Sequence, residues 1–515
     1  MPSRWGGRLA ALLLGAPLAL AFPRPGWWWL ALVGLVPLLL LAVAAPSGGE
    51  AAVRAWLGGT GFFLAVNAFL FPTVGPFMVP LAMLLAVRRP RAAPTRASQA
   101  AATARPGPRR LAAAMVLIPS AFVAGEALRS WEALGGPWGL LGASQWNAPA
   151  LLSVAALGGV WGLSFLLVAV NVAVAAAVGR GVPGPTRATA AAAAVALPLA
   201  ALAFWSLRPA PPPAGTVRVA YVQPGVVGPV EERFSASERL SRTLPAGARP
   251  DLVVWGESSV GRDPAANPGD IRRLVGVAVA AGAPVLANVD AQREAGGGIY
   301  KTALLVGPAG VLGSYDKMRL VPFGEYVPLR PLLGWVTRFT KAAAVDRHRG
   351  TRLAVLPAGK VAVGPLICFE SAFPDLARNL AADGADLVVV QTADTTFQGS
   401  WGLDQHASLS AVRAVESGRP VLQAALSGTS AAFDARGRRL AWAPGGWRGA
   451  AVVELPLSAE RTPYVRTGDV VPLACWVALA AGAAAAAARR RRLSRGGSGR
   501  RTGSTPRSTP ARPRR

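Results

Sequence analysis

Long apolar runs, separated by short polar or basic stretches, fill the first 207 residues of the chain. A helix that crosses a membrane needs about 20 mostly apolar residues. The first apolar run begins like a signal peptide, but further runs follow at once, so we expect a retained anchor. The pattern predicts seven membrane-spanning helices before residue 208 and an eighth near the C-terminus, at approximately 8–22, 27–45, 53–71, 73–87, 111–127, 157–179, 187–206 and 468–488.

From residue 216 the pattern changes to short β-branched runs that alternate with helical stretches. Strands are predicted at 217–222, 251–255, 361–367 and 386–391, and helices at 268–282 and 372–384. Buried strands with intervening helices are typical of a layered α/β domain, which we place at 216–457. A stiff Pro-rich linker at 208–215 precedes this domain, and a return segment and the last span at 458–488 follow it.

The distribution of charge supports this division. Residues 1–215 contain three of the 26 acidic residues, whereas 216–457 contain 21 of them together with 26 basic residues. The net charge of +28 therefore comes mainly from segments beside the apolar runs. Basic clusters in that position are typical of the cytoplasmic ends of membrane spans, and they favour a membrane protein over a nucleic-acid-binding protein.

The arginines also predict an orientation. Seven arginines lie between residues 88 and 110, and eleven follow residue 488, whereas the short loops predicted to be outside carry only Arg24 and Arg129. The rule that positive loops stay inside predicts a multi-pass protein of the cell (inner) membrane with both termini cytoplasmic. The segment 208–466 is then extracytoplasmic. The basic tail at 489–515 has too few apolar residues to fold, and we expect it to be disordered.

Three chemically active side chains follow predicted strands or turns, namely Glu257, Lys317 and Cys368. A carboxylate can take a thiol proton, the thiolate can attack an acyl carbon, and an ammonium can stabilise the oxyanion that develops. The chain is otherwise poor in lysine, with only Lys301, Lys317, Lys341 and Lys360. A lone cysteine at a strand end is more often a small buried apolar residue, so the spacing alone leaves both interpretations open. With two cysteines and two histidines, we expect no disulfide framework, no metal and no cofactor.

Sequence motifs around these residues resemble a known family. The segments Val253-Val-Trp-Gly-Glu-Ser-Ser259, Tyr315-Asp-Lys-Met-Arg-Leu-Val-Pro-Phe-Gly-Glu-Tyr-Val-Pro328 and Ile367-Cys-Phe-Glu370 resemble the signature segments of the apolipoprotein N-acyltransferases. These enzymes are the membrane branch of the nitrilase, or carbon–nitrogen hydrolase, superfamily. Residues 125–131, 136–145 and 413–420 resemble the family too. The resemblance implies a multi-pass helical membrane domain joined to an extracytoplasmic nitrilase-like αββα sandwich.

The resemblance also implies a reaction. Cys368 would take an acyl chain from a phospholipid as a thioester and pass it to the α-amino group of a diacylated apolipoprotein. Glu257 would be the general base and Lys317 the oxyanion stabiliser, with Glu325, Glu370 and Phe369 in support. The expected partners are these two substrates and membrane lipids, without nucleic acid, and we expect a monomer. The alternatives are a membrane-tethered nitrilase-type amidase that uses water as acceptor, and a non-catalytic scaffold, which would be expected to lack a residue of the triad.

Several positions differ from the family pattern. The family commonly has Pro where Gly256 stands, Tyr at Phe369, Asn at Lys301 and Asn at Ala393. None of these differences removes Glu257, Lys317 or Cys368. They concern the choice of acyl donor and the loops around the site rather than the class of reaction.

Overall fold

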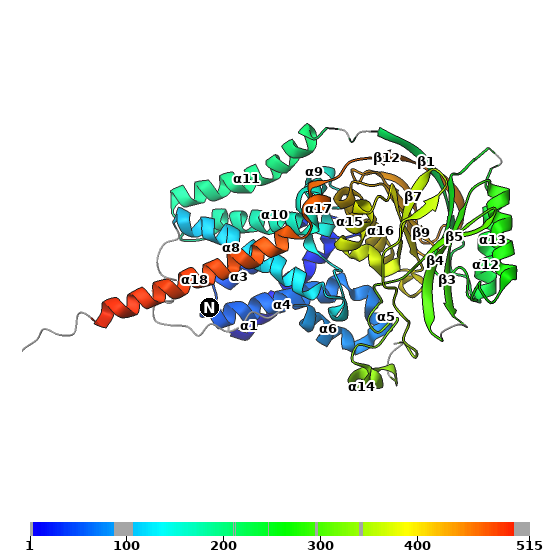
Figure 1. Cartoon of the computed structure of the whole chain (residues 1–515). Helices are drawn as coiled ribbons and strands as arrows, with labels where there is room; N and C mark the ends of the chain where they lie inside the picture. The colour runs from blue at the N-terminus through cyan, green and yellow to red at the C-terminus, as the bar shows by residue number, and fades with distance from the viewer. Residues whose placement is uncertain are drawn as a thin grey trace, which may run out of the picture.

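The computed structural model of the chain describes residues 4–86, 107–209, 211, 213–245, 247–293, 297–338 and 343–498. Figure 1 shows two parts side by side: a group of apolar helices built from the N-terminal segment and the C-terminal helix, and a sandwich of two β-sheets. Most of the predicted cytoplasmic loop around residues 87–106, and the tail from residue 499, lie outside the described residues.

The first part is helical almost throughout. Its α-helices are α1 (Arg4–Gly15), α2 (Leu30–Val33), α3 (Val36–Val43), α4 (Gly48–Val66), α5 (Phe71–Val74), α6 (Met78–Leu85), α8 (Pro108–Arg129), α9 (Pro149–Leu152), α10 (Ala155–Val178) and α11 (Gly184–Leu207). Short 3₁₀ helices connect them, namely η1 (Ala16–Ala21), η2 (Ala68–Leu70), η3 (Gly75–Phe77), η4 (Glu132–Leu134) and η5 (Leu141–Gln145). The chain returns to this group through α17 (Pro463–Thr467) and α18 (Val470–Ser498).

Helical segments occupy all eight predicted spans, but they differ in length. Within the described residues, five are long and apolar enough to cross a membrane: Ala68–Leu85, Pro108–Arg129, Ala155–Val178, Gly184–Leu207 and Val470–Arg489. The second predicted span is a shorter apolar stretch, Leu30–Val43, and the first is divided between α1 and η1 at a proline. The third, α4, carries Glu50 and Arg54, which lower its hydropathy. The count of eight spans stays a prediction.

Two six-stranded sheets form the second part, which confirms the expected αββα sandwich. One sheet has the order β12-β1-β2-β3-β4-β5, and the other β11-β10-β9-β8-β7-β6. In each sheet three neighbouring strands are parallel and the outer strands pair antiparallel. The strands are β1 (Pro213–Gln223), β2 (Leu252–Trp255), β3 (Val285–Gln292), β4 (Ile299–Gly307), β5 (Gly310–Asp316), β6 (Leu356–Ala358), β7 (Val361–Ile367), β8 (Leu387–Thr392), β9 (Val421–Ala425), β10 (Ser430–Phe433), β11 (Arg439–Ala443) and β12 (Gly449–Ser458).

Alternating side chains build the layers. On β2, Leu252 and Val254 pack between the two sheets, whereas Val253 and Trp255 face the opposite side. That opposite side is covered by α12 (Val230–Ser241) and α13 (Pro268–Ala281). The far face of the second sheet carries α15 (Pro374–Ala382) and α16 (Gly402–Ser417), which pack in turn against the apolar helices (Figure 1). Short helices lie in the loops of this part of the chain: α14 (Arg330–Leu333), η6 (Gly334–Arg338), η7 (Cys368–Ala372) and η8 (Thr395–Phe397).

Two boundaries differ from the predicted ones. β1 begins at Pro213, inside the predicted linker, because its first residues pair with the end of β12. At the other end, α18 continues to Ser498, so the first ten residues of the predicted disordered tail are helical. Alanine and arginine are both good helix formers, and once a helix has formed, adding residues to it is easy.

The helix α10 is broken near its start. Gly158 and Gly159 leave the helical conformation, and Gly159 has a φ of +65°. A Cβ at Gly159 would lie 2.7 Å from the Tyr464 ring, so the close approach of α17 also requires glycine there. Beyond the break, the Val160 amide donates a 2.6 Å hydrogen bond to the Glu416 carboxylate of α16. The contacts made at this break in α10 therefore connect the helical part to the sandwich.

Candidate active site

Glu257 is held between the two sheets. It follows β2 of the first sheet, and its backbone amide donates to the Thr392 carbonyl at the end of β8 in the second sheet. Its Oε2 accepts a 3.0 Å hydrogen bond from the Ala393 amide. The preceding residue must be small, because a Cβ on Gly256 would lie 1.9 Å from the Leu426 backbone nitrogen. This packing fixes a buried carboxylate at the edge of the sandwich.

Lys317 follows β5 and is fully buried. Its Nζ lies 2.8 Å from Glu325 Oε1 and 3.6 Å from Glu257 Oε1. Burial alone would lower the pKa of this ammonium, but Glu325 and Glu257 reverse the effect, so the pKa is raised and Lys317 stays charged. In return, Lys317 and Lys301 overcome the effect of burial on Glu325 and lower its pKa to about 2. The predicted residues Glu257, Lys317 and Glu325 therefore form one ion-pair cluster.

Cys368 follows β7 at the start of η7, in a strained backbone conformation with a φ of +53°. A non-glycine residue held there costs about 1–3 kcal/mol, and such strain is often found at active sites. The side chain is half-buried. Burial raises the pKa of the thiol and Glu257 raises it further, whereas Lys317 opposes the rise. The thiol therefore needs a base nearby in order to react as a thiolate.

Glu370 ties together the segments that carry the lysine and the cysteine. Its Oε1 accepts hydrogen bonds from the Tyr315 hydroxyl and from the amides of Met318 and Arg319, at 2.7, 2.7 and 3.0 Å. Its Oε2 accepts from the Ile367 amide at 2.8 Å. Burial raises the pKa of Glu370, and its hydrogen-bond donors oppose that rise. This carboxyl group fixes the spacing between the Lys317 and Cys368 loops.

Phe369 faces the helical part. Its ring packs edge-on against Phe373, with the ring centroids 5.1 Å apart. A Cβ on Gly136, in the loop after η4, would lie 2.5 Å from the Phe369 ring, so that loop lies directly on the residue after the cysteine. The helical part thus contacts the residue that directly follows Cys368.

Lys301 belongs to the cluster as well, although the sequence interpretation treated it only as a departure from the family pattern. It lies on β4, and its Nζ is 2.5 Å from Glu257 Oε1. Its retention in a chain that otherwise prefers arginine was a signal for this role. Its position in the site depends on how β3, β4 and β5 align, which local pattern does not reveal.

The pair formed by His406 and Asp394 was also missed. His406, on α16, contacts Asp394 Oδ1 through Nδ1 at 2.8 Å and the Cys368 carbonyl through Nε2 at 3.1 Å. Both acceptors are satisfied when each ring nitrogen carries a proton. Asp394, outweighing the effect of burial, raises the pKa of His406. Cys368, Asp394 and His406 also form a group whose spacing could hold a metal ion, so the predicted absence of metal stays a prediction.

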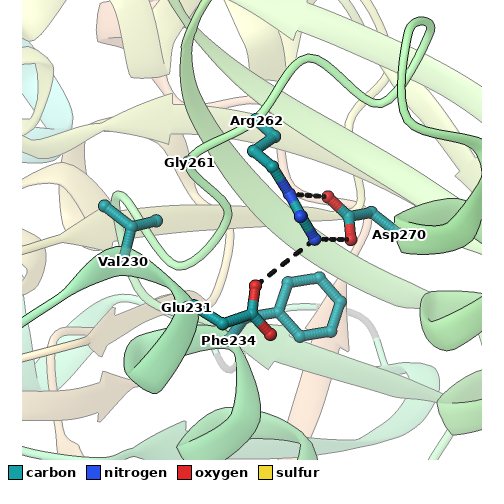
Figure 2. Close-up of a pocket in the computed structure, with 6 residues that line it drawn as sticks. All are labelled: Val230, Glu231, Phe234, Gly261, Arg262 and Asp270. Atoms are coloured by element: carbon teal, nitrogen blue, oxygen red, sulfur yellow. Dashed lines mark hydrogen bonds and ion pairs between the residues drawn. The ribbon is translucent and has the colours of Figure 1, made fainter.

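A separate hollow lies among the helices that cover the outer face of the first sheet. It has a volume of about 290 Å³ and lies between α12 and α13 (Figure 2). Arg262 crosses it, 2.6 Å from Asp270 and 3.3 Å from Glu231. The residues that line it are Val230, Glu231, Phe234, Gly261, Arg262 and Asp270, none of which belongs to the cluster around Glu257.

Comparison with solved structures finds similar chains over about half of this one. A carbon–nitrogen hydrolase from Helicobacter pylori is 17% identical, with a TM-score of 0.38, over 49% of this chain and 92% of its own. An amidase from Nesterenkonia is 22% identical, with a TM-score of 0.36, over 50% of this chain and 96% of its own.

Family models match both parts of the chain. The apolipoprotein N-acyltransferase N-terminal domain matches residues 14–173, and the carbon-nitrogen hydrolase model matches residues 218–462. The second match covers the sandwich and all the residues of the ion-pair cluster.

Curated relatives match almost the whole chain. An apolipoprotein N-acyltransferase from Geobacter metallireducens is 32% identical over 91% of this chain and 92% of its own length. Enzymes of the same name from Pseudomonas putida and Pseudomonas syringae pv. tomato are 31% and 30% identical, over 93% and 90% of this chain and 96% and 93% of their own lengths. With both domains matched in order and 32% identity over 91% of its length, the chain belongs to the apolipoprotein N-acyltransferase family.

Proposed function

We propose that this chain transfers a fatty acyl chain from a membrane phospholipid to the α-amino group of an apolipoprotein's N-terminal S-diacylglyceryl cysteine. One observation carries the proposal. Cys368, strained at the end of β7, is close enough to Glu257 and Lys317 for their charges to shift its pKa, and the residue that follows it, Phe369, meets the helical part at Gly136. Acyl chains of both substrates stay in a bilayer, and a thiol beside the membrane part of the protein can be reached from there.

In the first half-reaction Glu257 takes the Cys368 proton, and the thiolate attacks the ester carbonyl of the phospholipid. The oxyanion that forms is stabilised by the Lys317 ammonium, which Glu325 holds in place at 2.8 Å. The carbon–oxygen bond of the ester then breaks. The leaving lysophospholipid alkoxide takes the proton from Glu257, and the acyl chain remains on Cys368 as a thioester.

In the second half-reaction the α-amino group of the apolipoprotein attacks the thioester. Glu257 takes a proton from the amine, Lys317 again faces the oxyanion, and the carbon–sulfur bond breaks. The thiolate recovers the proton, and the product is an amide. Water must be excluded while the thioester waits, and the packing of Phe369 against Phe373 and the Gly136 loop supplies apolar surface for this.

Glu325 and Glu370 position these groups. Glu325 accepts from Lys317 Nζ and from the Val321 amide at 2.9 Å, which holds the ammonium toward Glu257. Glu370 binds the segments on either side of Lys317 and Cys368. Neither group has to exchange a proton with substrate.

We place the helical part in the cell membrane and the sandwich outside it. Five helices are long and apolar enough to cross in the described residues, and the segments from α1 to α4 would supply the other three of the eight spans. The arginines at 88–110 and after residue 488 favour cytoplasmic termini. With this orientation the sandwich is extracytoplasmic.

A reconstituted assay tests the proposal. Purified protein receives a phospholipid with one defined acyl chain, and the peptide that contains Cys368 is examined by mass spectrometry. A diacylglyceryl-modified lipopeptide is then added. We expect the acyl mass on Cys368 first and on the lipopeptide amine second, with Cys368→Ala inactive and Cys475→Ala, in α18, active.

The same assay distinguishes acyl transfer to the lipopeptide from the amidase alternative, in which water is the acceptor. Release of free fatty acid in place of lipopeptide acylation would make water the acceptor. Undiminished transfer by Cys368→Ala would overturn the assignment of the nucleophile.

A further inference from the structure

Lys301 gives this site a second ammonium group. The residue lies on β4 in register with Asp290 of β3, and only 9% of its surface is exposed. Its Nζ is 2.5 Å from Glu257 Oε1, 3.3 Å from Glu325 Oε1 and 3.6 Å from Asp290 Oδ2. Lys301 therefore contacts the predicted base more closely than Lys317 does, at 2.5 Å compared with 3.6 Å.

The positive and negative charges of the cluster are equal in number only when Lys301 is included. Glu257 and Glu325 face the two ammonium groups of Lys301 and Lys317, and Asp290 also pairs with Arg347 at 3.2 Å. Without Lys301, one ammonium would face two buried carboxylates. The cluster would then be one unit more negative beside the Cys368 thiol, whose ionisation Lys301 favours.

We propose that Lys301 is a positioning residue that holds the Glu257 carboxylate and sets the range of pH over which Cys368 can be acylated. The proposal rests on the proposed roles of Glu257 and Cys368. Lys301 acts through these two groups, because its ammonium is already engaged by three carboxylates. The oxyanion remains with Lys317.

Glu257 and Cys368, in their proposed roles, share one proton. Glu257 and Cys368 react when the pair holds a single proton, so the rate falls when the pair gains a second proton at low pH or loses the last one at high pH. A nearby positive charge opposes the gain of the second proton and favours the loss of the last one. Both pH limits of the reaction therefore move to lower pH. Removing Lys301 should therefore move both limits upward. The charged or titratable groups around the pair are Lys301, Lys317, Glu325, Asp290, Arg347, Asp394 and His406.

The test compares variants at position 301. Lys301→Met keeps the length of the side chain without its charge, and Lys301→Arg keeps the charge. Lys301→Asn introduces the residue that the family commonly has at this position. It is a second neutral variant, to be used if the Lys301→Met protein does not fold. Lys360→Met is the matched control, because Lys360 is 60% exposed and pairs with Asp251 away from the cluster.

Two rates are measured against pH with the full chain in detergent: acylation of Cys368 by phospholipid, and alkylation of the same thiol by iodoacetamide. An opposite charge within about 4–6 Å typically shifts a titration by about 1–3 units. We expect both limits of acylation, and the midpoint of alkylation, to rise by about 1–3 pH units in Lys301→Met and Lys301→Asn. Lys301→Arg and Lys360→Met should stay near wild type.

Unchanged limits in both neutral variants would overturn the inference. A shift of only one of the two pH limits would also overturn it. An equal loss of acylation rate at every pH in folded Lys301→Met and Lys301→Arg would overturn it too, because that result would indicate a purely structural role. The alkylation arm needs no lipid. If wild type took no acyl chain but its alkylation midpoint still depended on Lys301, the proposed function would fail and the electrostatic role would stand.

Discussion

Glu416 of the sandwich accepts a 2.6 Å hydrogen bond from the backbone amide of Val160, in the first turn after the break in α10. An amide in that position has no partner within its own helix, so a side chain from outside must satisfy it. The other carboxylate oxygen lies 2.8 Å from Arg413 Nε. Burial raises the pKa of Glu416 to about 7, with Arg413 and Val160 opposing the rise. We therefore expect the joint between the two parts of the protein to respond to pH.

The first prediction follows from the sign of that shift. The unfolded chain loses the Glu416 proton near its ordinary value of 4.5, whereas the folded chain keeps it until about pH 7. The contribution of this group to stability is therefore complete below about pH 4.5 and is lost as the pH rises through 7. Glu416→Gln retains an oxygen for Val160 but cannot ionise. We expect the variant to lose less stability than wild type between pH 5 and pH 8.

Thermal unfolding of the detergent-solubilised protein at these two pH values measures the effect. Glu454→Gln, an exposed position on β12, is the control and should behave as wild type. The same loss of stability in Glu416→Gln and wild type would contradict the prediction.

The second prediction separates the base from its supports. Glu257→Gln should lower the rate of thioester formation by about two to four orders of magnitude, because an amide cannot accept the thiol proton. Glu325→Gln and Glu370→Gln should cause smaller losses, since an amide oxygen still accepts some of their hydrogen bonds. Single-turnover acylation of Cys368 with a phospholipid donor gives the three rates. A Glu257→Gln enzyme that acylates normally would make Glu325 the next candidate for the base.

The third prediction concerns Gly256. A Cβ at this position would lie 1.9 Å from the Leu426 nitrogen and 2.6 Å from the Ala425 carbonyl carbon, which are backbone atoms that cannot turn aside. Gly256→Ala should therefore push the Glu257 loop away from β9 and destabilise the protein by about 1–3 kcal/mol. Acylation should fall with it. Gly276→Ala, in α13 and with open space around its Cβ, is the control for both measurements.

The fourth prediction concerns topology. In a Cys368→Ala background, a membrane-impermeant maleimide should label Lys360→Cys in intact cells but should not label Ser494→Cys until the membrane is opened. Lys360 is exposed on the sandwich, and Ser494 follows the arginine cluster on α18. Labelling of Ser494→Cys alone in intact cells would reverse the orientation. Equal labelling of both would show that the reagent had crossed the membrane.

Local pattern was enough to predict the strands that precede Glu257 and Cys368, but it did not predict β5, which precedes Lys317. The runs before Glu257 and Cys368 are strands because β-branched side chains alternate between two buried faces, and each reactive residue follows the strand that was expected. What local pattern could not supply was the pairing between strands. Lys301 meets Glu257 only because β4 is in register with β3. His406 reaches the Cys368 carbonyl from a helix 38 positions further along the chain.

The short apolar segments show a second limit. Residues 8–22 and 27–45 read as spans by composition, yet prolines divide the corresponding helices into pieces of 12 residues or fewer. Whether a divided helix crosses depends on its neighbours. That information is tertiary, and hydropathy along one chain does not contain it.

The site is divided between the two sheets, with Glu257 and Lys317 on the first and Cys368 on the second. Cys368, the proposed nucleophile, can therefore meet the proposed base and oxyanion stabiliser only after the sheets have packed face to face. During synthesis, Glu257 and Lys317 emerge well before β8 and β9, against which the Glu257 loop rests. We therefore expect that a partly made chain, which still lacks β8 and β9, cannot take an acyl chain from the phospholipids that are its proposed donors. The time at which Cys368 becomes reactive during synthesis should therefore report when the two sheets pack together.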